Sequence, residues 1–288
     1  MTVRYCGRDF SEDELTRIRR LIADHPDSSR AELSRQTCRL LAWHKPDGGL
    51  KEMSARVAML RMQADGLISL PAPRGKRPDP TIHLTTRTNP GTPIKQPAGT
   101  LAPLTLHRIQ HKPESGLWNE YIERYHYLGH KPLPGAQLRY LIHHRNRPLA
   151  LLGFGAAAWQ TAPRERYIGW NHEQRKKNLH LIVNNARFLI LPWVQSKNLA
   201  SMILAKAVRQ LPDDWEAQYA YRPVLLETFV EKPRFEGTCY KASNWRYLGQ
   251  TKGRGKLGPS GKQSVPIKDL WVYPLDAAFR ASLGSPKE

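Results

Sequence analysis

Acidic residues are scarce in this 288-residue chain, where 25 Asp and Glu stand against 45 Lys and Arg and leave a formal net charge of +20. Cysteine is scarcer still, and Cys6, Cys38 and Cys239 lie far apart. With no CxxC pair to hold zinc and an odd number of thiols, we expect reduced cysteines rather than a disulfide framework. The eleven histidines show no HxH or HExxH spacing, so they predict no metal centre either.

Long apolar stretches are also missing. The chain has no run of eighteen apolar residues, and its first ten residues, MTVRYCGRDF, contain no apolar signal region. We therefore expect a soluble, cytoplasmic protein without a membrane partner. Apolar residues nevertheless make up 40% of the chain, which is typical of a globular rather than a disordered protein.

The excess of positive charge favours a polyanion partner, most simply nucleic acid. This charge is unevenly distributed. Residues 1–75 carry 13 Lys and Arg against 10 Asp and Glu, whereas residues 241–270 carry 7 Lys and Arg against Asp269 alone. We therefore expect the positive field to be concentrated toward the C-terminal half, with an inert basic surface as the alternative.

The basic, glycine-rich loop 252–262 is the clearest binding signal. Its glycines let the backbone lie close to a phosphate chain, which Lys252, Arg254 and Lys256 would neutralise. Two aromatic residues shortly before the loop could stack on bases if the strands are separated. Because the loop lacks the G-x4-GK[ST] pattern of a P-loop, we predict DNA, duplex or single-stranded, rather than a nucleoside triphosphate. A solvated flexible loop is the alternative.

Residues 1–70 are predicted to form an N-terminal all-α winged helix-turn-helix domain. Capping residues followed by apolar residues at helical spacing predict three helices. Their starts are expected at Asp9 or Ser11, at Ser28 or Ser29, and at Leu50. A small strand is predicted at residues 67–70.

The third helix of a winged helix-turn-helix enters the major groove of DNA. Here that helix presents Lys51, Arg56 and Arg61 as the residues predicted to contact DNA. Its apolar positions at helical spacing are Met53, Val57, Leu60 and Met62. The low net charge of this region keeps open an alternative, a helical interaction module that does not touch DNA.

A proline-rich stretch, residues 71–103, follows. Its eight prolines and few apolar residues predict an extended linker rather than a core element. Residues 104–283 then form the second domain. Predicted strands come first there, followed by one long strand–helix crossover and further strands, an order that predicts a mixed α/β sheet.

The centre of the second domain is the stretch 181–210. Its apolar runs 181–183 and 188–191 predict a buried strand. A break at Pro192 and a polar turn then lead to a helix that begins near Asn198. Strand, polar turn and helix together aim free backbone N–H groups at an anion, although an ordinary βα unit has the same pattern.

This element order resembles the GNAT acyltransferase superfamily. In that superfamily a loop patterned Gln/Arg-x-x-Gly-x-Gly/Ala holds the pyrophosphate of acyl-CoA, and the matching residues here are Gln195, Asn198 and Ala200. Because Asn198 replaces a glycine, we expect its Cβ to weaken or block cofactor binding. The resemblance also implies that Tyr240 is a general acid for the leaving thiolate, whereas an amphipathic core residue is the alternative.

A second resemblance covers roughly residues 4–280. The runs IVNNARFLILPWVQSKNLAS and PVLLETFVEKPRFEGTCYKASNWRYLGQTKGRGK resemble the DruA family, proteins of the Druantia anti-phage defence system and of related insertion-element genes. The resemblance implies DNA-directed work in phage defence or transposition, with partner proteins from those systems. It supplies no catalytic residue.

Glu227 interrupts an otherwise apolar strand, where a carboxylate is costly unless it is paired, hydrogen-bonded or protonated. It is a candidate general base, a candidate metal ligand, or the partner of a buried arginine such as Arg187 or Arg234. Glu165 is the second acid beside an apolar motif. If both acids face one cleft, a metal-dependent phosphodiesterase becomes an option.

Three functional hypotheses follow. The first is a DNA-binding effector of anti-phage defence or of a mobile element. The second is a GNAT-type acyltransferase that acts on a nucleic-acid-linked substrate. The third is a metal-dependent DNA strand-cleaving enzyme of the transposase type. The cofactor therefore stays open between acyl-CoA and a divalent metal ion.

Overall fold

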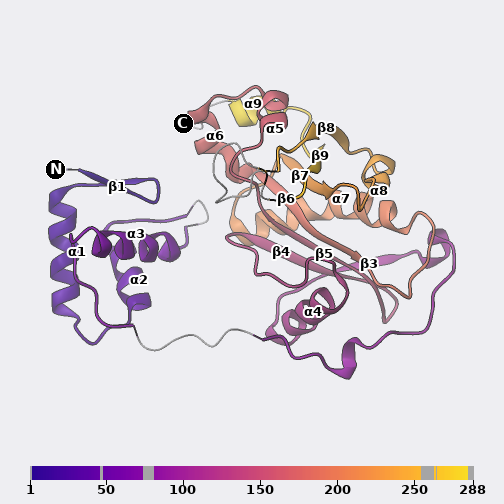
Figure 1. Ribbon diagram of the computed structural model, residues 1–288, viewed down its shortest axis with the longest axis horizontal. Helices are drawn as coiled ribbons and strands as arrows, with labels where there is room; N and C mark the ends of the chain where they lie inside the picture. The colour runs from indigo at the N-terminus through magenta and orange to yellow at the C-terminus, as the bar shows by residue number, and fades with distance from the viewer. Residues whose placement is uncertain (1, 46–47, 74–80, 254–262, 264, 285–288) are drawn as a thin grey trace. The chain divides into compact units, whose positions relative to one another are not determined.

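The computed structural model describes residues 2–45, 48–73, 81–253, 263 and 265–284. The chain forms two compact units, Met1–Pro80 and Thr81–Glu288. Figure 1 shows the helical first unit in indigo and violet and the second unit, with its large sheet, in magenta to yellow. None of the helices within the described ranges combines the length and the apolar character that crossing a bilayer requires.

The first unit is a β-hairpin followed by three helices. The strands are β1 (Val3–Tyr5) and β2 (Arg8–Phe10), and the helices are α1 (Glu12–Asp24), α2 (Arg30–Leu40) and α3 (Glu52–Ala64). Serine caps start the first two helices: Ser11 accepts a backbone N–H bond over 3.2 Å and Ser29 accepts one over 3.1 Å. Each cap satisfies an amide that has no partner inside the helix.

The strand predicted at residues 67–70 is wrong. These residues form no strand, and Ile68 is instead buried in the helical core. The two-stranded sheet of this unit lies at the start of the chain, where Val3 pairs with Phe10, so the unit is not all-α. Among the described residues no strand pairs with residues 67–70, and Leu67, Ile68 and Leu70 pack instead into the apolar core of this unit.

The apolar face predicted for α3 is also largely wrong. Met53, Val57 and Leu60 are exposed by 60%, 37% and 41%. The residues that α3 buries are Ala55, Ala58, Met59 and Met62. Small alanines allow close packing between helices, and this choice of face turns the larger side chains outward.

The predicted linker 71–103 differs from the structure after Pro80. From Thr81 onward the chain belongs to the second unit, where Ala98 and Leu101 are buried in the core. Ile94 forms a parallel bridge with Val194. Two short 3-10 helices, η1 (Thr86–Thr88) and η2 (Ala98–Leu101), interrupt this stretch, and several of its apolar side chains are buried in the domain.

The second unit is built on a seven-stranded mixed sheet, which confirms the predicted mixed α/β fold. In spatial order the strands are β3 (Leu104–Arg108), β4 (Gln137–His144), β5 (Arg147–Ala156), β6 (Ile182–Ile190), β7 (Leu225–Glu231), β9 (Lys268–Pro274) and β8 (Arg246–Gln250). Among these described strands β6 and β7 are parallel, and the other neighbours are antiparallel. Strands β4 and β5 run side by side in Figure 1.

Six helices accompany the sheet in the described part of this unit. They are α4 (Lys112–Tyr125), α5 (Ala162–Ile168), α6 (His172–Asn178), α7 (Leu199–Tyr219), α8 (Thr238–Ala242) and α9 (Phe279–Gly284). The central strand and helix match their prediction. Strand β6 is continuous, and α7 has Asn198 as its N-cap residue and buries Leu199, Ile203 and Leu204.

Strands β6 and β7 stay paired over only three positions, from Ile182 opposite Leu225 to Asn184 opposite Glu227. Beyond that point β6 continues beside β5, with a register shift around Ala186, and β7 continues beside β9. The two parallel strands therefore part in the middle of the sheet. A bulge at such a place re-aims the side chains around it.

Candidate functional site

A cavity of about 810 Å³ lies where β6 and β7 part. We call it the strand-gap cavity. Its walls come from β6, β7, α8 and the segment after α4, and the residues that bring functional groups to it include His126, Tyr127, Asn185, Arg187, Glu231 and Tyr240. Concave sites of this size that mix apolar and polar walls are typical of small-molecule binding.

Tyr240 of α8 brings a hydroxyl group to this cavity. The hydroxyl donates to the side-chain oxygen of Asn185 on β6 over 2.8 Å, and the hydroxyl of Thr228 on β7 lies 3.4 Å away. Tyr240 therefore connects the two strands beside the point where they part. Burial raises the pKa of Tyr240 well above its usual value, so the hydroxyl keeps its proton at neutral pH.

His126 lines the cavity from the segment after α4. Its Nδ1 accepts the backbone N–H of Leu128 over 3.2 Å, so we assign the proton of the neutral ring to Nε2. Burial, and after it the nearby Arg187, lower the pKa of His126 from 6.5 to about 4. The ring is therefore neutral at pH 7 and offers one N–H donor.

The lowered pKa of His126 predicts a specific loss of stability in mild acid. The unfolded chain takes up this proton near pH 6.5, whereas the folded chain takes it up only near pH 4, so the free energy of unfolding should fall as the pH drops through that window. His126→Asn should fall less steeply over the same window. Chemical denaturation of both proteins at pH 7.5, 6.5, 5.5 and 4.5 measures the difference, and parallel curves would contradict the assignment.

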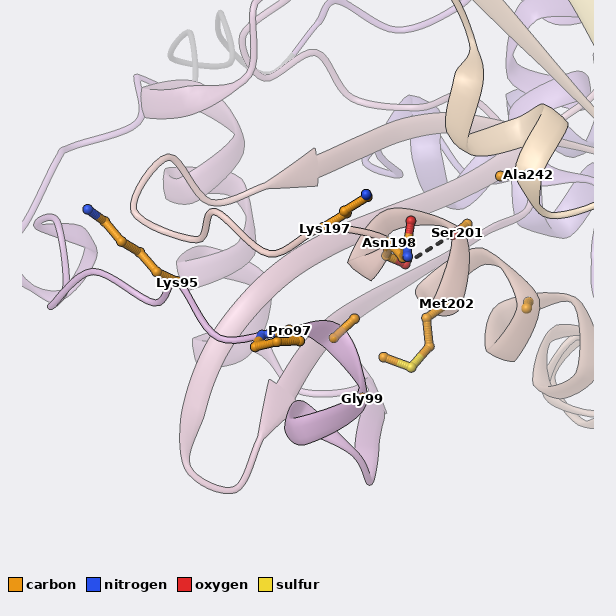
Figure 2. Close-up of a pocket in the computed structure, with 10 residues that line it drawn as sticks. Lys95, Pro97, Gly99, Lys197, Asn198, Ser201, Met202 and Ala242 are labelled. Atoms are coloured by element: carbon orange, nitrogen blue, oxygen red, sulfur yellow. Dashed lines mark hydrogen bonds between the residues drawn. The ribbon is translucent and has the colours of Figure 1, made fainter.

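A second cavity, of about 570 Å³, lies at the N-terminal end of α7, and we call it the helix-end cavity. Lys197, Asn198 and Ser201 line it from the turn and the first helical turn, and Lys95 lines it from the segment before β3 (Figure 2). The side chain of Asn198 makes no capping bond to α7. Two lysines beside an uncapped helix N-terminus favour an anion.

The two cavities share the same two helices. On α7, Ser201 lines the helix-end cavity and Ala200 lines the strand-gap cavity. On α8, Ala242 lines the first and Tyr240 lines the second. An elongated ligand that crosses the first turn of α7 would reach both cavities.

The three residues predicted to hold a cofactor do not all line a cavity. Asn198 and Ala200 line the two cavities, whereas exposed Gln195 lines neither and its backbone N–H donates to Ile94 over 2.8 Å. Asn198 has φ +66° and ψ 1°, a left-handed conformation that glycine adopts freely and asparagine tolerates better than most residues. The backbone at Asn198 therefore follows a path that glycine also adopts, and the predicted steric effect of its Cβ on a cofactor stays a prediction.

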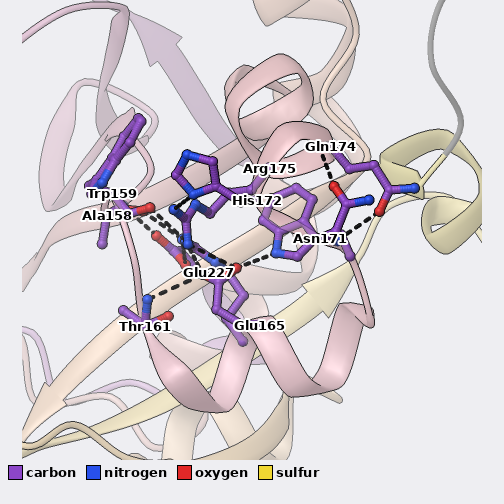
Figure 3. A network of polar contacts seen from close by, with 11 residues as sticks. Ala158, Trp159, Thr161, Glu165, Asn171, His172, Gln174, Arg175 and Glu227 are labelled. Atoms are coloured by element: carbon purple, nitrogen blue, oxygen red, sulfur yellow. Dashed lines mark hydrogen bonds and ion pairs between the residues drawn. The ribbon is translucent and has the colours of Figure 1, made fainter.

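Glu227 is the partner of a buried arginine, which is one of the three roles predicted for it. It forms an ion pair with Arg164 of α5 over 2.9 Å, and both side chains are fully buried. Its other oxygen accepts the backbone N–H of Ala158 over 2.7 Å. Arg164 also pairs with Glu165 over 2.8 Å, so one guanidinium joins the two carboxylates. Figure 3 shows Glu165 and Glu227 within this network of polar contacts. The partner is neither of the arginines named from the sequence.

The surroundings of these acids support a structural role. Glu165 also accepts the indole N–H of Trp170, and Arg175 lies 3.9 Å from it. Burial raises the pKa of Glu227, and Arg164 and an amide N–H oppose that rise. Since the guanidinium stays charged, it holds the position that a metal ion shared by both acids would need. No group of three or more His, Cys, Asp or Glu side chains in the described ranges could hold a metal ion.

The residues predicted to contact DNA are at the surface to different extents. Lys51 and Arg56 are half-buried, whereas Arg61 and Lys252 are exposed. Arg254 and Lys256, together with most of the predicted loop 252–262, lie outside the described residues. The exposed side of α3 also carries the apolar residues noted above, which does not favour a helix that reads DNA.

Sequence reasoning missed three residues of the strand-gap cavity. Arg187 was considered only as a partner for Glu227, and His126 and Glu231 were not singled out. No spacing rule links them, because they come from β6, from the segment after α4 and from the end of β7. One signal was present: polar residues, among them Asn184 and Arg187, interrupt the apolar pattern of β6.

Known proteins are similar to this chain over different stretches. A family model described as "Druantia protein DruA" matches residues 63–277, and no curated protein matches the chain. A solved polyamine N-acetyltransferase of Drosophila melanogaster is 12% identical with a TM-score of 0.37, and the match covers 59% of this chain and 99% of that one. A variant of the spermidine N-acetyltransferase of Vibrio cholerae is 13% identical with a TM-score of 0.39, and that match covers 62% of this chain and 98% of the other.

Proposed function

The chain belongs to the DruA family of Druantia proteins, and within that family we propose that its second unit is an acyltransferase of the GNAT type. The observation that carries the proposal is the hydroxyl of Tyr240 at the point where β6 and β7 part. The strand-gap cavity there and the helix-end cavity at α7 share the same helical turn. This arrangement suits a long ligand with an anionic end and a reactive end.

Several features of the chain fit acyl-CoA, which when bound would supply an acyl group activated as a thioester. Asn198 has a left-handed backbone conformation. Glycine, which stands at this position in the phosphate-binding loop of the GNAT superfamily, adopts that conformation freely. Lys95 and Lys197 add positive charge near the uncapped α7 amides. The hydroxyl oxygen of Ser196, in the same turn, is buried and has no hydrogen-bond partner among the described residues.

In the proposed acyl transfer, two residues of the strand-gap cavity carry out one proton transfer each. The net reaction breaks the carbon–sulfur bond of the thioester and forms a carbon–nitrogen or carbon–oxygen bond to the acceptor. Tyr240 would hold a proton at its hydroxyl oxygen for the leaving thiolate, and water would return a proton to Tyr240 afterwards. Glu231, whose side chain is 16% exposed and lies 3.9 Å from Lys268, takes the proton that the acceptor loses.

A charge placed in the first turn of α7 tests the proposed cofactor. Ser201→Glu should weaken acetyl-CoA binding by at least about tenfold, because like charges placed together in a binding site cost several kcal/mol. A carboxylate at a helix N-terminus does not destabilise the helix itself. Isothermal titration calorimetry measures the affinity, and Gln218→Glu, which adds the same charge at the exposed far end of α7, is the matched control. Absence of acetyl-CoA binding to the wild type would refute the acyltransferase.

A second candidate function is that of a DNA-binding effector in anti-phage defence or in a mobile element. The observation that favours it is the net charge of +20, of which residues 241–270 carry +6. The two candidates are compatible, because a basic surface can deliver an acyltransferase to a nucleic-acid-linked substrate. Phosphate contacts of this kind supply affinity that depends strongly on salt.

The triple variant Lys252→Ala/Arg254→Ala/Lys256→Ala tests the basic loop. Removal of three phosphate contacts should flatten the slope of log affinity against log salt by about two to three units. Fluorescence anisotropy on duplex and single-stranded DNA gives the slope for both proteins. An unchanged slope would exclude the loop from the DNA interface and leave Lys51, Arg56 and Arg61 as the predicted contacts.

A further inference from the structure

Arg187 lines the strand-gap cavity without an acidic partner. Its guanidinium donates to the carbonyl of Ala186 over 2.8 Å. In the described part of the chain no Asp or Glu oxygen lies within 4.0 Å of it. A guanidinium keeps its charge on partial burial and has five N–H donors. Most of these donors are therefore available to a ligand in the cavity.

Two exposed aromatic rings stand at the same cavity. Tyr127 and Phe235 are exposed by 37% and 45%, and their ring centroids are 5.2 Å apart. The guanidinium of exposed Arg234 lies over the ring of Tyr127, 4.9 Å from its centroid. Exposed rings beside arginines are the surfaces on which nucleobases stack.

The charged side chains that line the cavity are three cations and two acids, which leaves one positive charge in excess. Glu231 faces Lys268 over 3.9 Å, so this acid and this lysine offset each other. Glu236 is exposed at the rim. Neutral His126 adds an N–H donor rather than a charge. The inner wall thus offers donors and positive charge next to flat apolar rings.

We propose that the mouth formed by Tyr127, Arg187, Arg234 and Phe235 binds a nucleotide. The two rings meet edge to face with 62° between their planes, so the base stacks on one of them while the other supports it, and the phosphate lies against the two guanidinium groups. This inference rests on the proposed function in one respect, since it names the acceptor class of the transferase. A free nucleotide and an unpaired nucleotide of single-stranded DNA share this chemistry, and the net charge of +20 is compatible with either source.

The test is isothermal titration calorimetry on the full chain without acetyl-CoA. The probes are dAMP, a 5′-phosphorylated deoxyadenosine trinucleotide, deoxyadenosine and inorganic phosphate. Both nucleotide probes carry a base and a phosphate and should bind, and each of the other two should bind at least roughly tenfold more weakly because it lacks one group. Tighter binding of dAMP assigns the site to free nucleotides, and tighter binding of the trinucleotide assigns it to single-stranded DNA.

Variants at the mouth decide whether these residues form the site. Arg187→Gln and Tyr127→Leu should each weaken dAMP or trinucleotide binding by roughly tenfold, whereas Arg209→Gln, an exposed arginine on α7, should not. Tyr127 is exposed, so its variant remains informative if Arg187→Gln fails to fold. Unchanged affinity in Tyr127→Leu would overturn the proposal, as would equal binding of inorganic phosphate or of a polyglutamate peptide.

Acetyl-CoA titrations separate this inference from the proposed function. Arg187→Gln and Tyr127→Leu should weaken acetyl-CoA binding by less than they weaken nucleotide binding, because the anionic end of acetyl-CoA is proposed for the helix-end cavity, which neither residue lines. A protein that binds acetyl-CoA but no nucleotide overturns the inference alone. A protein that binds dAMP but not acetyl-CoA overturns the acyltransferase and keeps the nucleotide site.

Discussion

Replacement of Arg164 by methionine should lower the free energy of unfolding of the second unit by about 3–5 kcal/mol. Arg164 and Glu227 are both fully buried, and loss of the guanidinium leaves a carboxylate inside the protein with no opposite charge. Glu165 loses its 2.8 Å partner in the same step. A buried unpaired charge is among the most destabilising changes that one substitution can cause.

Chemical denaturation followed by tryptophan fluorescence measures the effect of Arg164→Met. Arg222→Met is the control, because Arg222 pairs with Asp213 and Glu216 at the surface and its loss should change stability by less than about 1 kcal/mol. The double variant Arg164→Met/Glu227→Leu should recover part of the lost stability, since it removes both charges. A loss below 1 kcal/mol in Arg164→Met would show that Glu227 is protonated in the native protein and would return it to the list of catalytic candidates.

Tyr240→Phe should reduce the turnover of acyl transfer by roughly 100- to 1,000-fold while acetyl-CoA still binds. The variant removes only the hydroxyl, which is the proton donor beside the parted strands, and keeps the ring that packs in the core. Turnover should therefore fall while the affinity for acetyl-CoA is kept. Loss of a purely structural residue would be expected to lower both. The measurement is acetyl-CoA consumption with the nucleotide probe that binds most tightly as the proposed acceptor.

Tyr247→Phe is the matched control for this prediction. It removes the same hydroxyl group from an exposed tyrosine on β8, outside both cavities, and should leave turnover unchanged. Thermal denaturation of both variants shows whether loss of the bond to Asn185 has unfolded the site. Full activity in a folded Tyr240→Phe protein would contradict the proposed role of Tyr240 and point to water as the proton donor.

The elements of the second unit could be predicted because local pattern and tertiary environment agree there. The apolar residues of β6 and the helical spacing of Leu199, Ile203 and Leu204 describe faces that are in fact buried. The first unit shows the opposite case. On α3, residues 53, 57 and 60 have helical spacing but are exposed, because the alanine face packs inward.

The candidate site could be predicted only in part. Tyr240 and Ala200 were found because the element order places them near the crossover. Arg187, His126 and Glu231 were not found, because they meet only after the sheet brings β6, β7 and the segment after α4 together. The conformation of Asn198 was equally hidden, since its residue type is compatible with several regions of backbone space and the chain path around it selects one.

The sequence by itself determined that the chain is basic and globular. It also determined the three N-terminal helices, the mixed sheet and the one strand–helix crossover. These follow from charge, spacing and capping, which act over a few residues. Only the tertiary structure decided that Glu227 pairs with Arg164 and that β6 leaves β7 after three residue pairs. Contacts between residues 63 positions apart depend on how the whole sheet packs, and no local pattern encodes them.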